Sequence, residues 1–195
     1  MSKAIDPLHD PTDEQVIVLT RRWVEHAVIG LNLCPFANAV LRKNQIAFQV
    51  SHARDADTLL QNLMDSIEWL LATPAEATDT LLLIHPWVLS DFFEFNDLIG
   101  DIETLLEDSG LEGVLQIASF HPDYQFAGVA TDDVTNHTNR SPFPILHLLR
   151  EDSLDKAIGA MPHTDDIIER NLDTMRQLGT DGWQTLQARI RKDTA

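Results

Sequence analysis

The sequence predicts an α/β domain: a small, mostly parallel sheet of three to four strands, covered by helices and followed by extra C-terminal helices. Short apolar segments at 46–51, 80–84 and 113–120 alternate with helical patterns, which gives a β-α-β-α-β order. The segment 80–84 is apolar on both faces, as in strands covered on both sides, and such strands are usually parallel. We therefore expect parallel strands joined by right-handed crossovers.

Length and composition set the domain organisation and exclude some partners. A chain of 195 residues suits one domain, and we expect a loose N-terminal arm at 1–11 followed by a single α/β domain at 12–195. The net charge of −17 opposes binding to phosphate backbones and anionic membranes, so we expect neither nucleic acid nor membrane partners. One cysteine and no signal-peptide core at the N-terminus favour a bacterial, cytoplasmic protein.

The first three helices carry recognisable start and stop signals. Thr12 with Gln15 forms a capping box, and this helix is expected to end near Gly30. Asp55 can cap a second helix, which the Thr73-Pro74 step ends. A third helix is expected to open at Asp91 with Glu94 and to end at Gly110, where a left-handed residue fits.

The second half of the chain is predicted to contain one edge strand and three further helices. We expect an edge strand at 126–130, and a helix that begins after the cap Ser141 with Pro142 at its first position. The apolar residues at 145–149 then predict that this helix is buried. Further helices are expected at 165–178, where Gly179 stops the pattern, and around 183–190.

Each of the three predicted parallel strands ends in a histidine: His52, His85 and His121. Ligands of open α/β sheets bind outside the carboxyl ends of the strands, and imidazole suits acid–base work and metal binding. We expect His85 and His121 on one edge, close enough to share a ligand, either as catalytic groups or, with His52, as ligands of a divalent metal. The alternative is that these histidines only cap loops.

The long polar loop at 121–142 is the expected position of the site, because structureless loops of that length are uncommon unless they are functional or disordered. Arg140 and Arg150 can bind a carboxylate, either of a substrate or of the protein itself. His147 shares the predicted helix face of Arg150 and is a further catalytic candidate. The candidate substrate-binding residues are Arg140, Arg150, Asn139, Asp123 and Gln125.

Cys34 is the single thiol and a candidate nucleophile if a histidine lies beside it. Its neighbours Leu33 and Phe36 are apolar, and burial in apolar surroundings raises the pKa of a thiol. We therefore predict a packed, unreactive cysteine and keep the catalytic role as the alternative.

Several strings resemble the bacterial domain-of-unknown-function 1415 family. They are Gly-Leu-Asn-Leu-Cys-Pro-Phe-Ala (30–37), Gln-Ile-Ala-Ser-Phe-His-Pro-Asp-Tyr-Gln-Phe-Ala-Gly (116–128), Thr-Asn-Arg-Ser-Pro-Phe-Pro (138–144), His-Leu-Leu-Arg-Glu (147–151) and Glu-Arg-Asn (169–171). The resemblance covers roughly residues 15 to 180 and implies no activity. It implies that the matching positions are family motif positions: Cys34, His121, Asp123, Gln125, Asn139, Arg140, His147, Arg150, Arg170 and Asn171. His52 lies outside these strings.

The favoured hypothesis is an enzyme that acts on a small anionic metabolite. In it, His121 and His85 serve as acid–base groups or ligands, and Arg140 and Arg150 orient the substrate. The alternative is a non-catalytic binding or interaction protein, in which the loop at 121–142 is a structural clasp and the acidic surface meets a basic partner. A concave pocket with a perturbed pKa favours the enzyme, and fully paired arginines without a pocket favour the clasp.

Overall fold

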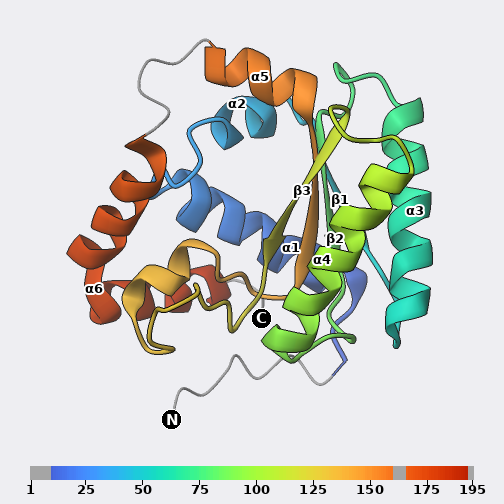
Figure 1. The fold of residues 1–195 in the computed structure, drawn as a ribbon. Coiled ribbons are helices and arrows are strands. Elements are labelled where there is room, and N and C mark those ends of the chain that lie inside the picture. The colour runs from blue at the N-terminus through green and yellow to red at the C-terminus, as the bar shows by residue number, and fades with distance from the viewer. Residues whose placement is uncertain (1–9, 160–165, 193–195) are drawn as a thin grey trace.

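The computed structural model describes residues 10–159 and 166–192, so nearly all of the arm expected at 1–11 lies outside the described residues. The strands form one sheet with helices on both faces (Figure 1). Figure 1 shows this sheet nearly edge on, with α3 (Ala56–Ala72) and α4 (Phe92–Asp108) on one side. On the other side lie α1 (Asp13–Trp23) and α6 (Ile167–Arg191).

The predicted starts of the first three helices are confirmed. Thr12 and Gln15 form the reciprocal capping box of α1. Asp55 accepts the backbone N–H of Thr58 at the start of α3, and Asp91 accepts two N–H groups at the start of α4. The chain between α1 and the first strand contains a π-helical segment and a short helix, which are η1 (Val24–Ile29) and α2 (Ala37–Arg42).

The sheet is mixed, so the prediction of a mostly parallel sheet is wrong. Its strands are β1 (Ile46–Val50), β2 (Thr80–Ile84), β3 (Leu115–Phe120) and β4 (Ile145–Arg150), in the spatial order β1-β2-β4-β3. β1 pairs with β2 in parallel, whereas β4 is antiparallel to both β2 and β3. The three predicted strands do run in one direction, but β4 separates the second from the third.

The predicted helix after Ser141 is a strand instead. Ser141 and Phe143 each precede a proline, which disfavours the helical conformation at both residues and keeps the chain extended. The segment 145–149 is apolar except for His147, and each face of the sheet has an apolar core. A short apolar run of this kind does not distinguish a strand from a buried helix. The chain returns from the carboxyl end of β3 without crossing the sheet, so β4 is antiparallel to β3.

The predicted edge strand at 126–130 is also wrong. This segment is a turn with Gly128 at φ 75°, and a short 3₁₀ helix, η2 (Val134–Thr138), follows it. The last helices are α5 (Glu151–Gly159), which the sequence did not predict, and α6. α6 is interrupted at Gly179, as predicted, where φ is 64° and ψ is 176°. Among the described residues, no helix is long and apolar enough to cross a membrane.

Each face of the sheet has its own apolar core. Residues of α3 and α4 pack on one face against alternate positions of the strands. Fully buried members of this core are Leu59, Leu63, Leu81, Phe95, Ile102 and Leu148. The opposite core joins α1 and α6 to the other alternate positions, and its buried members include Val16, Trp23, Ile84, Ile145, Met175 and Trp183.

Candidate functional site

The structure places all three strand-end histidines on the same edge of the sheet. β1, β2 and β3 run in one direction, and His52, His85 and His121 follow their carboxyl ends. His85 and His121 lie on either side of the chain that leads into β4. The backbone N–H of His85 donates to Pro144 O over 3.1 Å, and the N–H of Ser141 donates to His121 O over 3.4 Å.

The rings of His85 and His121 are buried and engaged in hydrogen bonds with the backbone. Both pack against the ring of Phe95, at centroid distances of 5.5 and 5.2 Å. His85 is 0% exposed and donates from Nδ1 to Val88 O. His121 is 1% exposed, donates from Nε2 to Leu89 O and accepts the backbone N–H of Asp123 at Nδ1. These bonds fix the segment after β2 to the sheet edge, as loop-capping histidines do.

Burial keeps both imidazoles uncharged. Desolvation is the main cause that lowers the pKa of His85 to about 4. The hydrogen bond to the Val88 carbonyl raises this pKa, and the nearby His121 lowers it further. Desolvation also lowers the pKa of His121, although the nearby carboxylates of Asp123 and Asp91 oppose this shift. Two neutral, enclosed rings are poorly placed to exchange protons with a ligand.

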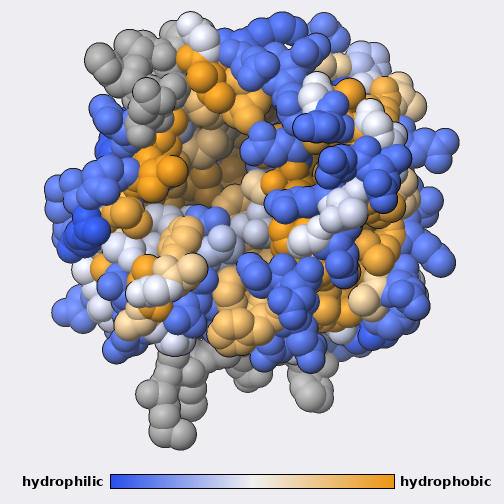
Figure 2. Space-filling view, in the orientation of Figure 1, coloured by the Kyte–Doolittle hydropathy of each residue, from blue (hydrophilic) through white to orange (hydrophobic). Residues whose placement is uncertain are grey.

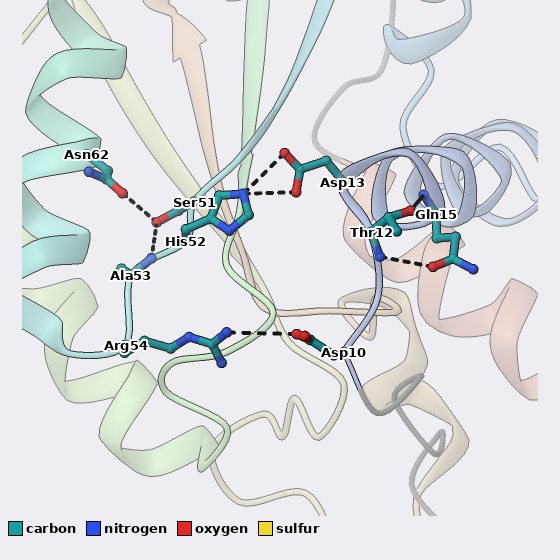
Figure 3. A network of polar contacts seen from close by, with 9 residues as sticks. All are labelled: Asp10, Thr12, Asp13, Gln15, Ser51, His52, Ala53, Arg54 and Asn62. Carbon is teal, nitrogen blue, oxygen red and sulfur yellow. Dashed lines mark hydrogen bonds and ion pairs between the residues drawn. The ribbon is translucent and has the colours of Figure 1, made fainter.

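His52 lies apart from the other two histidines, on the surface. Its Nε2 is 2.9 Å from an oxygen of Asp13, and its ring stacks on Trp87 at 4.9 Å. Figure 3 shows the contact between His52 and Asp13 beside the pair of Arg54 and Asp10, which joins the start of α1 to the chain after β1. Within residues 10–159 and 166–192, no three His, Cys, Asp or Glu residues are grouped to hold a metal.

The loop at 121–142 is held together by its own side chains. Arg140 donates from Nε to Tyr124 O over 3.0 Å and from Nη2 to Thr131 O over 2.8 Å. Asn136 accepts the N–H of Phe126 and donates to Ala130 O. The side-chain amides of two predicted substrate-binding residues also bond to backbone carbonyls. Gln125 donates to Val129 O, and Asn139 donates to Ser119 O at the end of β3.

A cavity of about 530 Å³ opens between this loop and α6, and we call it the Arg140 cavity. Of the predicted site residues, Arg140 and Asp123 line it. The other residues that define it are Leu19, Trp23, Pro122, Thr131, Asp132, His137, Ser141, Pro142, Thr180, Trp183, Gln184, Gln187, Ile190 and Arg191. Burial lowers the pKa of the half-buried Arg140 guanidinium, and the Asp123 carboxylate opposes that shift.

His137 is the histidine of the Arg140 cavity. Its ring stacks on Trp183 of α6 with a centroid distance of 4.6 Å and an interplanar angle of 17°. Desolvation, and then the positive charge of Arg140, lower its pKa to about 4. Its buried Nδ1 has no hydrogen-bond partner in the part of the chain that the structure describes. Sequence reasoning did not select His137 or Trp183, because no local pattern brings an α6 residue onto this loop.

The remaining predicted site residues lie elsewhere. Arg150, at the carboxyl end of the antiparallel β4, is at the opposite edge of the sheet from His121. There it donates to three backbone carbonyls, those of Leu70, Thr73 and Thr78. Arg150 therefore does not lie at the loop 121–142, where the sequence predicted the site.

His147 and Cys34 do not lie at the edge of the sheet where His85 and His121 are. His147 lies in the middle of β4, where its Nε2 is 2.6 Å from the hydroxyl oxygen of Thr80. Cys34 is half-buried in the connector before α2, close to the point where Asn171 of α6 donates to Leu33 O over 2.7 Å. The predicted low reactivity of Cys34 stays a prediction.

The comparisons with known proteins give one match. The family model described as "Protein of unknown function (DUF1415)" matches residues 15–185, which is most of the chain. No curated protein and no solved structure matches. The description of that family names no reaction and no ligand.

Proposed function

Because the chain belongs to the DUF1415 family of proteins of unknown function, we propose a function from its site alone: a cytoplasmic enzyme that acts on a small anionic metabolite bound in the Arg140 cavity. One observation carries this proposal. Nε and Nη2 of Arg140 donate to loop carbonyls, whereas Nη1 has no hydrogen-bond partner among the described residues. Arg140 lines the cavity, and we assign its Nη1 to the ligand.

An anion is the ligand that this environment favours. A half-buried guanidinium loses hydration, and a charge-assisted hydrogen bond to a carboxylate or phosphate restores that lost stabilisation. Within residues 10–159 and 166–192, no carboxylate forms an ion pair with Arg140. The cavity volume of about 530 Å³ is in the range of small-molecule sites.

His137 is the acid–base group of this proposal, in place of the enclosed His85 and His121. At neutral pH its ring is uncharged, and the positive charge of Arg140 contributes to that. A bound anion adds negative charge beside the ring and offsets Arg140, so it raises the pKa of His137 toward neutrality. Substrate binding thus prepares His137 to take up and return a proton.

The binding part is tested by titration calorimetry with inorganic phosphate and with succinate. Arg140→Gln removes the charge and is expected to weaken binding at least tenfold, which is what one hydrogen bond to a charged group contributes. Arg42→Gln removes a positive charge from exposed Arg42 at the end of α2, away from the cavity, and should leave the affinity within about twofold. Equal binding by the Arg140→Gln protein would reject the proposal.

The acid–base part is tested by pH. Anion binding should tighten as the pH falls from 8 to 5, because the complex takes up a proton at His137 that the free protein lacks. His137→Phe keeps an aromatic ring against Trp183 and should abolish this extra tightening. If the pH dependence is the same in both proteins, His137 is not the proton acceptor.

The structural clasp remains the second candidate function of the loop. Its support is the set of hydrogen bonds that Arg140 and Asn136 make to carbonyls within the loop. If the loop is only a structural clasp, we expect Arg140→Gln to lower the melting temperature, and neither phosphate nor succinate to bind the wild-type protein.

A further inference from the structure

A hollow lies on the sheet face opposite α3 and α4, away from the Arg140 cavity. Figure 2 shows it on the α6 side of β3 and below α5, with apolar side chains along its walls. The main packing partners of α6 are η2, α1 and η1, and none of these is a strand. Trp23 of α1 covers Phe120 at the end of β3, and the hollow in Figure 2 lies on the remaining part of the face that β3 and β4 form.

The register of β3 and β4 identifies the strand residues on this face. His147 pairs with Ala118, and alternation along the two strands places Gln116, Phe120 and Leu149 on the same side. All five retain accessible surface, whereas the neighbouring Leu146 and Leu148 on the other face are 0% exposed. We call this region the His147 hollow. Its five strand residues carry no formal charge at neutral pH, since burial lowers the pKa of His147 to about 4.

Two hydrogen bonds fix the protonation of the His147 ring. The Thr80 hydroxyl oxygen is 2.6 Å from Leu148 O and 2.6 Å from His147 Nε2. A carbonyl only accepts, so the hydroxyl proton is donated to Leu148 and Nε2–H donates to the Thr80 oxygen. Nδ1 is then the nitrogen with the lone pair.

That lone pair is available. None of the described residues donates a hydrogen bond to His147 Nδ1, and it is not among the fully buried atoms without a partner. The ring lies beside Phe120 at a centroid distance of 6.0 Å. An oriented acceptor next to apolar side chains is the arrangement found in small-molecule sites, which are mostly apolar with a few placed polar groups.

We propose that the His147 hollow is a second binding site, for a small uncharged molecule that has an apolar body and one hydroxyl or amide N–H donor. The donor binds His147 Nδ1, and the apolar body covers Phe120, Ala118 and Leu149. The absence of formal charge on the strand residues that form this part of the hollow selects against ions. This site is independent of the anion site, because His147 lies in the middle of β4 and the Arg140 cavity lies beyond the strand ends.

The experiment compares phenol with toluene, which has the same shape without the donor. The full-length protein with ¹⁵N-labelled histidine is titrated with each compound, and the side-chain nitrogen resonances are followed by NMR. Phenol should shift the Nδ1 resonance of His147 saturably, and toluene should leave it unchanged. His147→Phe should weaken phenol binding about fivefold, the contribution of one neutral hydrogen bond, and make the two compounds equivalent.

A second variant keeps the test decisive if His147→Phe fails to fold. Leu149→Trp fills the hollow and leaves the histidine in place, so it should abolish the phenol-induced shift. A phenol titration without any change at His147, an equal response to toluene, or an unchanged shift in the Leu149→Trp protein would each overturn the proposal. None of these results affects the anion site, which is read out by phosphate binding at Arg140.

Discussion

At the scale of single residues, the histidines of this protein differ in what their second nitrogen does. Both nitrogens of His121 are used by the backbone. His85 uses one nitrogen and buries the other, which has no partner among the described residues. His147 donates from Nε2 to the hydroxyl oxygen of Thr80, and its Nδ1 accepts no hydrogen bond from the described residues. Of these three rings, only that of His147 has a nitrogen that is neither bonded to a described residue nor fully buried.

The Thr80→Val variant should be less stable than the wild type by about 1–3 kcal/mol. The substitution preserves shape but leaves the buried Nε2–H of His147 without its acceptor, and unsatisfied buried polar groups cost that much. Urea denaturation measures the free energy of unfolding.

The matched control for this change is Thr104→Val. The hydroxyl of exposed Thr104 bonds to Gly100 O on the surface of α4 and can be replaced by water. We expect a change within about 0.5 kcal/mol for this control. Equal effects at the two positions would mean that the Thr80 hydrogen bonds do not stabilise the fold.

At the scale of elements, the insertion of β4 determines where the arginines lie. Because β4 enters at the edge of His85 and His121 and leaves at the opposite edge, Arg140 and Arg150 end on different sides of the sheet. Arg140 closes the loop before β4, and Arg150 joins the end of β4 to the chain after α3. One strand thus separates two residues that the predicted helix would have placed together.

The break in α6 is also a property of a single element. Gly179 has φ 64° and ψ 176°, a conformation that residues with a Cβ rarely adopt. Gly179→Ala should therefore lower the free energy of unfolding by about 1–3 kcal/mol. Crowding does not contribute, since outside the neighbouring chain and helix backbone no atom of the described residues lies within 4 Å of the added Cβ. Thermal or urea denaturation reports the change.

Gly100 provides the control for this prediction. It lies inside α4 and has ordinary helical geometry. Outside the backbone of its own helix, an added Cβ again meets no atom of the described residues within 4 Å. Gly100→Ala should be neutral or stabilising by up to about 1 kcal/mol, because alanine favours the helix. If both substitutions stabilise the protein, the conformation at Gly179 is not strained for alanine.

At the scale of the whole molecule, charge and buried histidines act in opposite directions when the pH falls. The net charge of −17 becomes smaller in acid, which reduces self-repulsion. Burial lowers the pKa of His85, His137 and His147 to about 4, below the value of 6.5 that an unfolded chain has. Between these pH values the unfolded state binds more protons, so the histidines destabilise the folded state as the pH falls from 6.5 to 4.

We expect the His147→Phe protein to be less sensitive to acid than the wild type. Removing one such histidine should reduce the loss of unfolding free energy by at most about 1.4 kcal/mol per pH unit between pH 6 and 5. Urea titrations at several pH values measure this difference, and the general charge effect cancels between the two proteins. His52→Phe, at an exposed position, is the control. If it changes the pH dependence of the unfolding free energy as much as His147→Phe does, the effect does not come from the burial of His147.

The sequence by itself determined the features that depend on neighbouring residues. The caps at Thr12, Asp55 and Asp91 each bond an N–H within three residues, so a local pattern is sufficient to predict them. The common direction of β1, β2 and β3 follows from the crossover helices between them. For the same reason, the sequence alone places His85 and His121 on one edge of the sheet.

Only the tertiary structure decided the features that depend on distant segments. The run at 145–149 is apolar on both sides, which suits a buried helix or a central strand equally, and pairing with β2 and β3 decides between them. The partners of Arg150 lie more than 70 residues away, and the Arg140 cavity is lined by His137 and by Trp183 of α6, which packs on it. Such contacts depend on which segments pack together across the whole chain, and no local pattern in the sequence encodes that choice.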